Sequence, residues 1–306
     1  MAKSILITGA NGGLGKECAR QLALKDQTQK IYLGCRNPEK AQTTKLSLEA
    51  STGKLIFEIV IIDLSNLDSV KVAIELLNDP IDVLIMNAGG TGGKNHSDKT
   101  VDGVTEIVAV NLLGHVVLLE ALLKAKKLTN MALYAGSEAA RGVPKMGLKR
   151  PNLKTSSVDE FRSICDGSFF ADNQDALFIY GHVKYMAALW MASMARKYPD
   201  IRLVTVSPGS TTGTNVANDL GLVMRLLFKA ISPPLLPLIG LMHTLEAGAR
   251  RYVKVINDTS YKSGVFYASQ AHVLTGPLLD QGTIFDDLNN KTFQDNANEA
   301  IHRFIS

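Results

Sequence analysis

The stretch ILITGANGGLGKE, residues 5–17, decides the fold of this chain. Glycines stand at positions 9, 12, 13 and 15, directly after an apolar run of strand length. A glycine-rich turn between a strand and a helix lets backbone amides and the positive helix end approach a phosphate. The spacing Gly9-x-x-x-Gly13-x-Gly15 differs from the commoner Gly-x-Gly-x-x-Gly fingerprint. We therefore expect a dinucleotide pyrophosphate here, with a ligand-free glycine turn as the alternative.

Apolar segments of strand length alternate with helix-length amphipathic segments along the whole chain. The predicted strands are residues 4–8, 30–35, 55–62, 83–87, 131–136, 201–207 and 264–268. The predicted helices include residues 67–77, 102–126 and 175–197. Most strands are continuously apolar, which indicates a parallel sheet covered on both faces. The pattern predicts an α/β fold, a doubly wound, seven-stranded parallel sheet of the Rossmann type, in a single domain over 1–306.

Composition narrows the classes of partner and compartment. The net charge is only +4, and no basic stripe interleaved with aromatic residues predicts nucleic-acid binding. The three cysteines are isolated, so we expect no metal site, and a reducing, cytoplasmic location is favoured. We expect no signal peptide, and the apolar stretch 231–242 is too short and too rich in proline to span a bilayer.

The second predicted strand ends in GCRNPEK, which bears on the choice of cofactor. In dinucleotide folds an acidic side chain here selects NAD, whereas an arginine accommodates a 2′-phosphate. Arg36 stands at this place with Lys40 one turn further on, and no carboxylate ends the strand. We therefore predict NADP(H); a solvated surface arginine is the simpler alternative.

Seven motifs follow one another along the chain. They are TGANGGLG (8–15), Asp63, MNAGG (86–90), Asn111 in VNLLGH, Ser137 in YAGSEAA, Tyr180-x-x-x-Lys184, and SPGSTTGT (207–214). Tyr-x-x-x-Lys alone arises by chance on many helices, but the ordered set resembles the short-chain dehydrogenase/reductase family over nearly the whole chain. LGCRNPEKA, VNLLGH and SPG are most similar to its retinol-dehydrogenase-like and protochlorophyllide reductase branch.

The resemblance implies a catalytic set and a set of cofactor contacts. The implied catalytic residues are Asn111, Ser137, Tyr180 and Lys184. The expected cofactor contacts, with Arg36 from the argument above, are Gly9, Asn11, Gly12, Gly13, Leu14, Gly15, Arg36, Asp63, Leu64, Asn87, Ala88, Gly89, Lys184, Pro208, Gly209 and Thr212. It also implies that Asn111 anchors a water that links Lys184 to solvent.

Tyr180 and Lys184 are four positions apart and share one face of a helix. An ammonium beside a phenol favours the phenolate and lowers the pKa of the tyrosine. We expect Tyr180 to donate a proton to a carbonyl oxygen, and Ser137 to hydrogen-bond the same oxygen. Lys184 is expected to contact the nicotinamide ribose as well.

Two segments depart from the shorter members of the family. Between Ser137 and Tyr180 lie 42 residues, and we expect the insert at about 141–179 to wall one side of the active-site cleft. The protochlorophyllide reductases carry a cysteine directly after Pro-Gly, where this chain has Ser210. Gly213 replaces the usual threonine, so the carboxamide contact is expected at Thr212 or Thr214.

The segment at about 215–244 is apolar and is expected to be a substrate lid. It indicates a small hydrophobic carbonyl or alcohol, or a conjugated double bond, as substrate. The alternative is a face packed on the domain or on a membrane surface, with Arg225 and Lys229 suited to peripheral contact.

The sequence thus predicts an NADPH-dependent oxidoreductase, acting as a monomer or homodimer. The alternatives are a redox-inert NADP(H)-binding sensor, a light-dependent protochlorophyllide-type reductase, or a sugar-nucleotide epimerase. Sensors tend to lose the tyrosine or the lysine, and this chain keeps both. The glycine spacing and the short C-terminal part disfavour the epimerase.

Overall fold

A central eight-stranded sheet organises the computed structural model, which describes residues 3–144, 147–211 and 242–305. The strands follow the order β3-β2-β1-β4-β5-β6-β7-β8. Their bounds are β1 Ser4–Thr8, β2 Lys30–Cys35, β3 Phe57–Ile61, β4 Ile81–Met86, β5 Leu128–Ala135, β6 Arg202–Val206, β7 Phe266–Ala268 and β8 Leu279–Asp280. From β1 the chain adds β2 and β3 on one side of the sheet, and then returns to add β4 and the later strands on the other side of β1. Such a switch point opens a crevice at the carboxyl ends of the strands.

The prediction of seven strands is wrong by one. The first seven strands are parallel as predicted, and β8 adds an antiparallel edge through the pairs Tyr267↔Asp280 and Ala268↔Leu279. β8 is only two residues long, so it has no periodicity that a sequence pattern would reveal.

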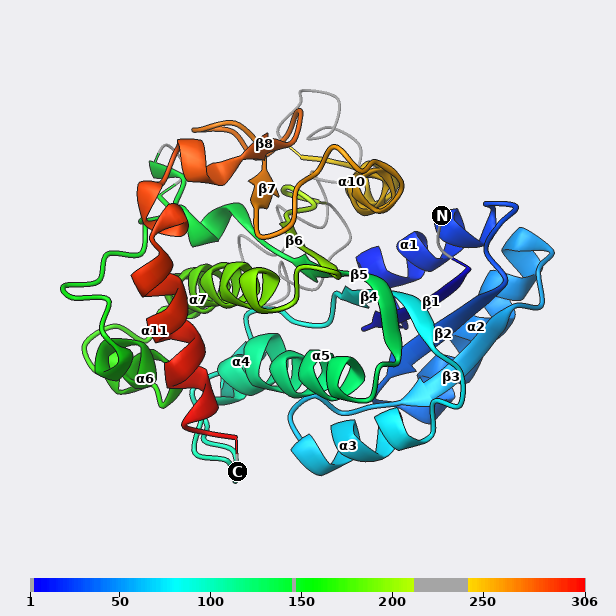
Figure 1. The fold of residues 1–306 in the computed structure, drawn as a ribbon, viewed down its shortest axis with the longest axis horizontal. Helices are drawn as coiled ribbons and strands as arrows, with labels where there is room; N and C mark the ends of the chain where they lie inside the picture. The colour runs from blue at the N-terminus through cyan, green and yellow to red at the C-terminus, as the bar shows by residue number, and fades with distance from the viewer. Residues whose placement is uncertain (1–2, 145–146, 212–241, 306) are drawn as a thin grey trace.

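Helices cover both faces of the sheet (Figure 1). On one face lie α1 Gly13–Ala23, α2 Pro38–Thr52 and α10 Leu245–Asn257. On the other lie α3 Leu67–Glu75, α5 Gly114–Lys124 and α7 Ala176–Lys197, with α6 Val158–Cys165 and α11 Lys291–His302 outside α7. Each face buries its own apolar cluster against the sheet, and the turns that bear ligands lie at the strand ends.

The helix predicted over 102–126 is built from three pieces. A short α4 at Glu106–Val108 leads into a π-helical turn at Ala109–Leu113, and α5 follows. A π turn leaves carbonyls without their usual helical partners, and such turns are frequent at functional sites. This turn contains Asn111, one of the predicted catalytic residues.

The segment Glu106–Lys124 is also long and apolar enough to cross a membrane by length and composition. However, 78% of its apolar window is buried inside the protein. Its apolar residues therefore serve core packing between the sheet and the neighbouring helices.

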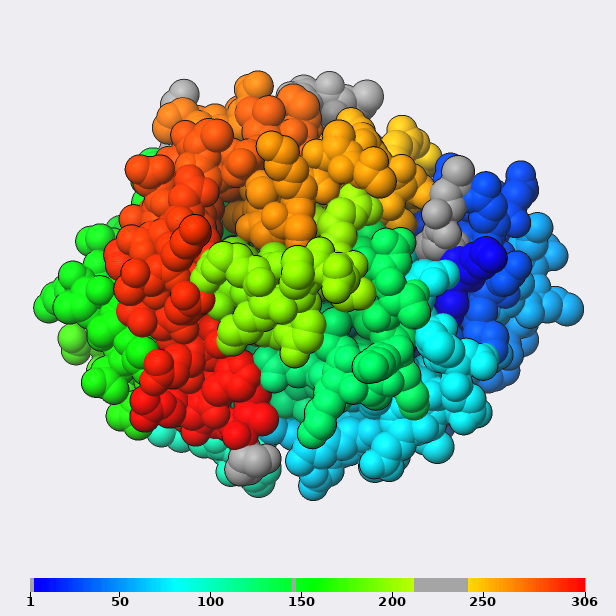
Figure 2. All heavy atoms as spheres, viewed as in Figure 1, coloured from blue at the N-terminus to red at the C-terminus, as the bar shows by residue number. Residues whose placement is uncertain are grey.

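The insert is only in part what the sequence predicted. Its helix α6 buries Phe161, Ile164 and Cys165. The centre of the Phe161 ring lies 6.4 Å from the centre of the Tyr185 ring of α7. The C-terminal helix α11 packs against both α6 and α7 (Figure 2). Helix α6 of the insert thus packs into the hydrophobic core, and a deletion there would expose apolar surface. The expectation that the insert walls the active-site cleft stays a prediction.

Candidate active site

The glycine turn between β1 and α1 brings the backbone into close approach. Gly9 and Gly13 adopt left-handed φ angles of 64° and 51°. A Cβ on Gly15 would lie 2.3 Å from the carbonyl oxygen of Gly9, so no side chain fits there. Gly12, the N-cap of α1, has no side-chain cap and open space beside its Cα. An open, uncapped helix N-terminus of this kind fits a pyrophosphate.

Replacing Gly15 by alanine should therefore damage the fold itself. The new Cβ meets backbone atoms of Gly9, which cannot rotate away. We expect the melting temperature of Gly15→Ala to fall by several degrees, with loss of dinucleotide binding. Gly12→Ala is the matched control, because it enters open space in an extended conformation and should melt like the parent. Equal melting temperatures for the two variants would contradict this assignment.

A cavity of about 310 Å³ opens beside the glycine turn, at the carboxyl ends of β2 and β4. It is lined by Arg36, Gly89, Gly90, Thr91, Gly92, Gly93, Glu106, Ile107, Val110 and Asn111. Arg36 is exposed at the end of β2, and backbone rather than bulky side chains forms the Gly89–Gly93 wall. Together with the open N-terminus of α1, these residues fit a nicotinamide dinucleotide.

Several predicted cofactor contacts also make hydrogen bonds within the protein. The amide nitrogen of the Asn87 side chain donates to the carbonyl oxygens of Thr8 and Gly9. The Thr8 hydroxyl accepts from the backbone amides of Asn87 and Ala88. Asp63 accepts hydrogen bonds from Ser65. The sequence did not predict this role for Thr8, which reads as an ordinary strand residue.

The remaining predicted cofactor contacts divide between the turn, the loop after β3 and a segment only partly described. Asn11 and Leu14 lie in the glycine turn, and Leu64 is buried in the loop after β3. Pro208 and Gly209 follow β6. Thr212 and the predicted lid up to residue 241 lie outside the described residues.

The four predicted catalytic residues converge at the ends of β5, α7 and the π turn. Tyr180 is hydrogen-bonded to Ser137, and Lys184 Nζ lies 5.4 Å from the centre of the Tyr180 ring. Lys184 is 2% exposed and donates to the carbonyl oxygen of Ala135 at 2.9 Å. The Asn111 side chain bonds the N–H and C=O of Gly90 at 3.1 and 2.8 Å, so it fixes the wall of the cavity.

Burial dominates the electrostatics of this site. It raises the pKa of Tyr180 to about 12, partly offset by the hydrogen bond from Ser137, while the Glu138 charge raises it further. Burial also lowers the pKa of Lys184 to about 7. The pKa of Tyr180 is therefore raised rather than lowered as predicted, because desolvation drives each of the two groups towards its neutral form.

A buried polar cluster directly behind Ser137 escaped the sequence analysis. Glu138 is 3% exposed and accepts hydrogen bonds from Ser207 and Ser269, and Arg251 Nη1 lies 3.6 Å from its carboxylate. Ser207 also accepts from the amide of Gly209. Glu138 thus ties the Pro-Gly segment after β6 to the loop that carries Ser137. A single carboxylate between Ser137 and Ala139 forms no sequence pattern that would have predicted this role.

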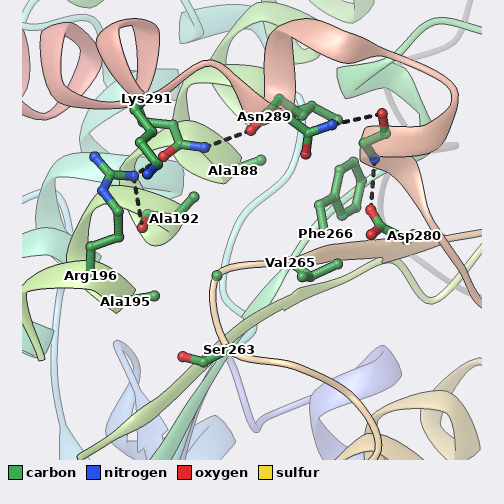
Figure 3. Close-up of a pocket in the computed structure, with 14 residues that line it drawn as sticks. Ala188, Ala192, Ala195, Arg196, Ser263, Val265, Phe266, Asp280, Asn289 and Lys291 are labelled. Atoms are coloured by element: carbon green, nitrogen blue, oxygen red, sulfur yellow. Dashed lines mark hydrogen bonds between the residues drawn. The ribbon is translucent and has the colours of Figure 1, made fainter. Parts of the chain in front are cut away.

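Another hollow, of about 240 Å³, runs along α7 beyond the catalytic residues. Its walls include small and apolar residues of α7 and of the β7 region: Ala188, Ala192, Ala195, Val265 and Phe266 (Figure 3). Arg196 at its rim is bonded to Gln294 and Asp295. Its charge is already matched, so we assign no ligand there. Among the described residues no cluster of His, Cys, Asp and Glu is suited to hold a metal ion.

Comparison with known proteins agrees with this geometry. Residues 3–138 match the family model described as short chain dehydrogenase. Retinol dehydrogenase 11 of Homo sapiens is 34% identical over 128 residues, which are 41% of this chain and 39% of that protein. Protochlorophyllide reductase B of Hordeum vulgare is 29% identical over 286 residues, covering 86% of this chain and 69% of that protein. The chain thus spans well under half of the first relative and about two thirds of the second.

Solved structures share the fold. Salutaridine reductase from Papaver somniferum superposes with a TM-score of 0.62 at 16% identity, covering 87% of this chain and 99% of that one. NADPH-bound carbonyl reductase from chicken fatty liver gives a TM-score of 0.57 at 18% identity, covering 86% and 95%. With the ordered motifs, the Rossmann-type sheet and the match over residues 3–138, the chain is similar to the short-chain dehydrogenase/reductase family of oxidoreductases.

Proposed function

We propose that this protein is an NADPH-dependent reductase that transfers hydride between NADP(H) and a small hydrophobic carbonyl or alcohol. The observation that carries the proposal is the convergence of Ser137, Tyr180 and Lys184 beside a cavity suited to a dinucleotide. Hydroxyl, phenol and ammonium groups in this arrangement are what the reduction of a carbonyl requires of a protein.

A nicotinamide cofactor held in this cavity would supply the hydride for the carbonyl carbon. Tyr180 then gives its phenolic proton to the carbonyl oxygen, and Ser137 donates a hydrogen bond to that oxygen as negative charge develops there. Lys184 lies against the Tyr180 ring, and its charged form makes loss of the phenolic proton easier. Asn111 and Glu138 hold the surrounding backbone in place.

The preference for NADP(H) over NAD(H) rests on Arg36. Its guanidinium is exposed at the end of β2, where a 2′-phosphate would lie, and it has room to pair with that phosphate. We expect Arg36→Ala to remove an NADPH preference of at least about tenfold, equal to about 1.4 kcal/mol. Fluorescence titration with NADPH and NADH measures it, and Lys45→Ala on α2 is a charge-matched control.

An unchanged preference in Arg36→Ala, or equal affinities in the parent, would contradict the choice of cofactor. Binding of NADH should stay the same in both variants, because NADH has no 2′-phosphate to meet the arginine.

The whole proposal is tested by offering apolar aldehydes and ketones to the protein with NADPH and following the NADPH absorbance. Consumption of NADPH with formation of the matching alcohol supports the reductase. If NADPH binds and no carbonyl compound is consumed, the redox-inert sensor becomes the better description. We do not propose light-driven chlorin reduction, because Ser210 stands where the protochlorophyllide reductases carry their cysteine.

A further inference from the structure

Tyr134, near the end of β5, lies between two parts of the candidate active site. Its side chain is fully buried. Its hydroxyl is 2.6 Å from the carbonyl oxygen of Asn111 and 3.1 Å from Lys184 Nζ. Edge contacts of its ring with His115 and Trp190, at centroid distances of 5.8 and 6.4 Å, fix its orientation.

The direction of these hydrogen bonds follows from the groups involved. A carbonyl oxygen only accepts, so the Tyr134 proton must go to Asn111, and the oxygen of Tyr134 is left to accept from Lys184. The same carbonyl lies 3.2 Å from His115 Nδ1, which must also donate. The π turn exposes this carbonyl to both side chains.

Lys184 Nζ therefore donates hydrogen bonds to two neutral acceptors of β5, Tyr134 Oη and the carbonyl oxygen of Ala135. Within the described part of the chain it forms no ion pair with a carboxylate. A buried ammonium without a counter-charge depends on such acceptors to remain charged.

We propose that Tyr134 is a positioning residue for Lys184: its hydroxyl holds the ammonium against Tyr180 and keeps it charged. Tyr134 touches neither substrate nor cofactor in this account and acts through Lys184. The consequence for turnover rests on the proposed reductase function, whereas the consequence for Lys184 itself does not.

The other titratable groups around this pair do not take over the role. Burial lowers the pKa of His115 to about 3, so the imidazole is neutral, and burial raises the pKa of Tyr134 well above its usual value. Tyr180 faces Lys184 from the same helix, and the Glu138 charge acts on Tyr180. A hydrogen bond that a charged donor gives to a neutral acceptor is stronger than one between two neutral groups.

The test is Tyr134→Phe, which removes one oxygen and keeps the ring. The pKa of Lys184 is read from the titration of its side-chain carbon signal by NMR in the free protein. We expect it to fall by about one unit, equal to about 1.4 kcal/mol. From a parent value of about 7, reductase turnover should then match the parent near pH 5 and be about tenfold lower above pH 8.

Tyr185→Phe is the matched control, because it removes a buried hydroxyl one residue from Lys184 that has no hydrogen-bond partner in the described structure. It should change neither the lysine titration nor the pH profile. If Tyr134→Phe does not fold, Tyr134→Met lacks the same oxygen and should shift the same titration.

An unchanged Lys184 pKa, with activity lost equally at every pH, would overturn the proposal and make Tyr134 a packing residue. If the parent protein reduces no carbonyl compound, the reductase function fails, and the lysine titration still decides the role of Tyr134.

Discussion

Tyr180→Phe is expected to lower the rate of the chemical step by at least about 10², the usual cost of a lost general acid. The substitution removes the phenolic oxygen and keeps the ring, which lies half-buried beside Ser137 and Lys184. The fold and the affinity for NADPH should survive, because the cavity lining does not include this oxygen. Single-turnover kinetics with NADPH and a carbonyl substrate measure the step.

Circular dichroism and NADPH titration are the controls for the same variant. If Tyr180→Phe reduced carbonyl compounds as fast as the parent, Tyr180 would be a packing residue and Ser137 or a water would have to supply the proton.

Lys184→Met should lower turnover by about as much as Tyr180→Phe does. Unlike Tyr180→Phe, it should also raise the stability of the folded protein at low pH. Without the ammonium, no positive charge beside the Tyr180 ring stabilises the phenolate that forms as Tyr180 gives up its proton. We expect turnover to fall by at least about 10² at pH 7, and NADPH to bind more weakly if the lysine contacts the ribose. Steady-state kinetics and fluorescence titration separate the two losses.

The stability of Lys184→Met depends on pH in a direction fixed by the lowered pKa. The lysine pKa is about 7 in the folded protein against 10.5 for the free group, so burial of the charge destabilises the parent fully below pH 7. As pH rises from 7 to 10.5, the unfolded chain binds more protons and the parent gains stability. Lys184→Met should therefore melt above the parent below pH 7, with an advantage that shrinks towards pH 10.5. An advantage that grows with pH would contradict the buried ammonium.

The sequence predicted the parts of the fold whose physics is local. The strands at 4–8 and 30–35 have the predicted bounds, because each is a short, continuously apolar run bounded by polar or turn residues. The catalytic motifs lie together as the family resemblance implied, because successive parallel strands bring their carboxyl ends to one edge of the sheet.

The features that were missed depend on contacts between distant residues. The π turn around Asn111 has the composition of an ordinary apolar helix, so its sequence does not reveal it. Helix α6 is buried in the core because α11, from the C-terminal end of the chain, packs against it. Tyr134 reads as one more apolar strand residue, and its hydroxyl acquires meaning only where β5 meets Asn111 and Lys184. Desolvation of Lys184 likewise comes from the assembled fold.

Some predictions from the sequence stay predictions. These are the cytoplasmic location, the monomeric or homodimeric state, the absence of nucleic-acid binding and the membrane contact through the lid.

The transfer of deuterium from NADPH labelled at the reactive carbon of the nicotinamide tests the central claim most directly. The labelled cofactor is mixed in single turnover with a reactive apolar ketone, and the product alcohol is analysed by mass spectrometry. The account predicts one deuterium on the former carbonyl carbon for each NADPH oxidised, at a rate reduced by at least about 10² in Tyr180→Phe. Oxidation of NADPH without label in the alcohol, or no alcohol at all, would contradict it.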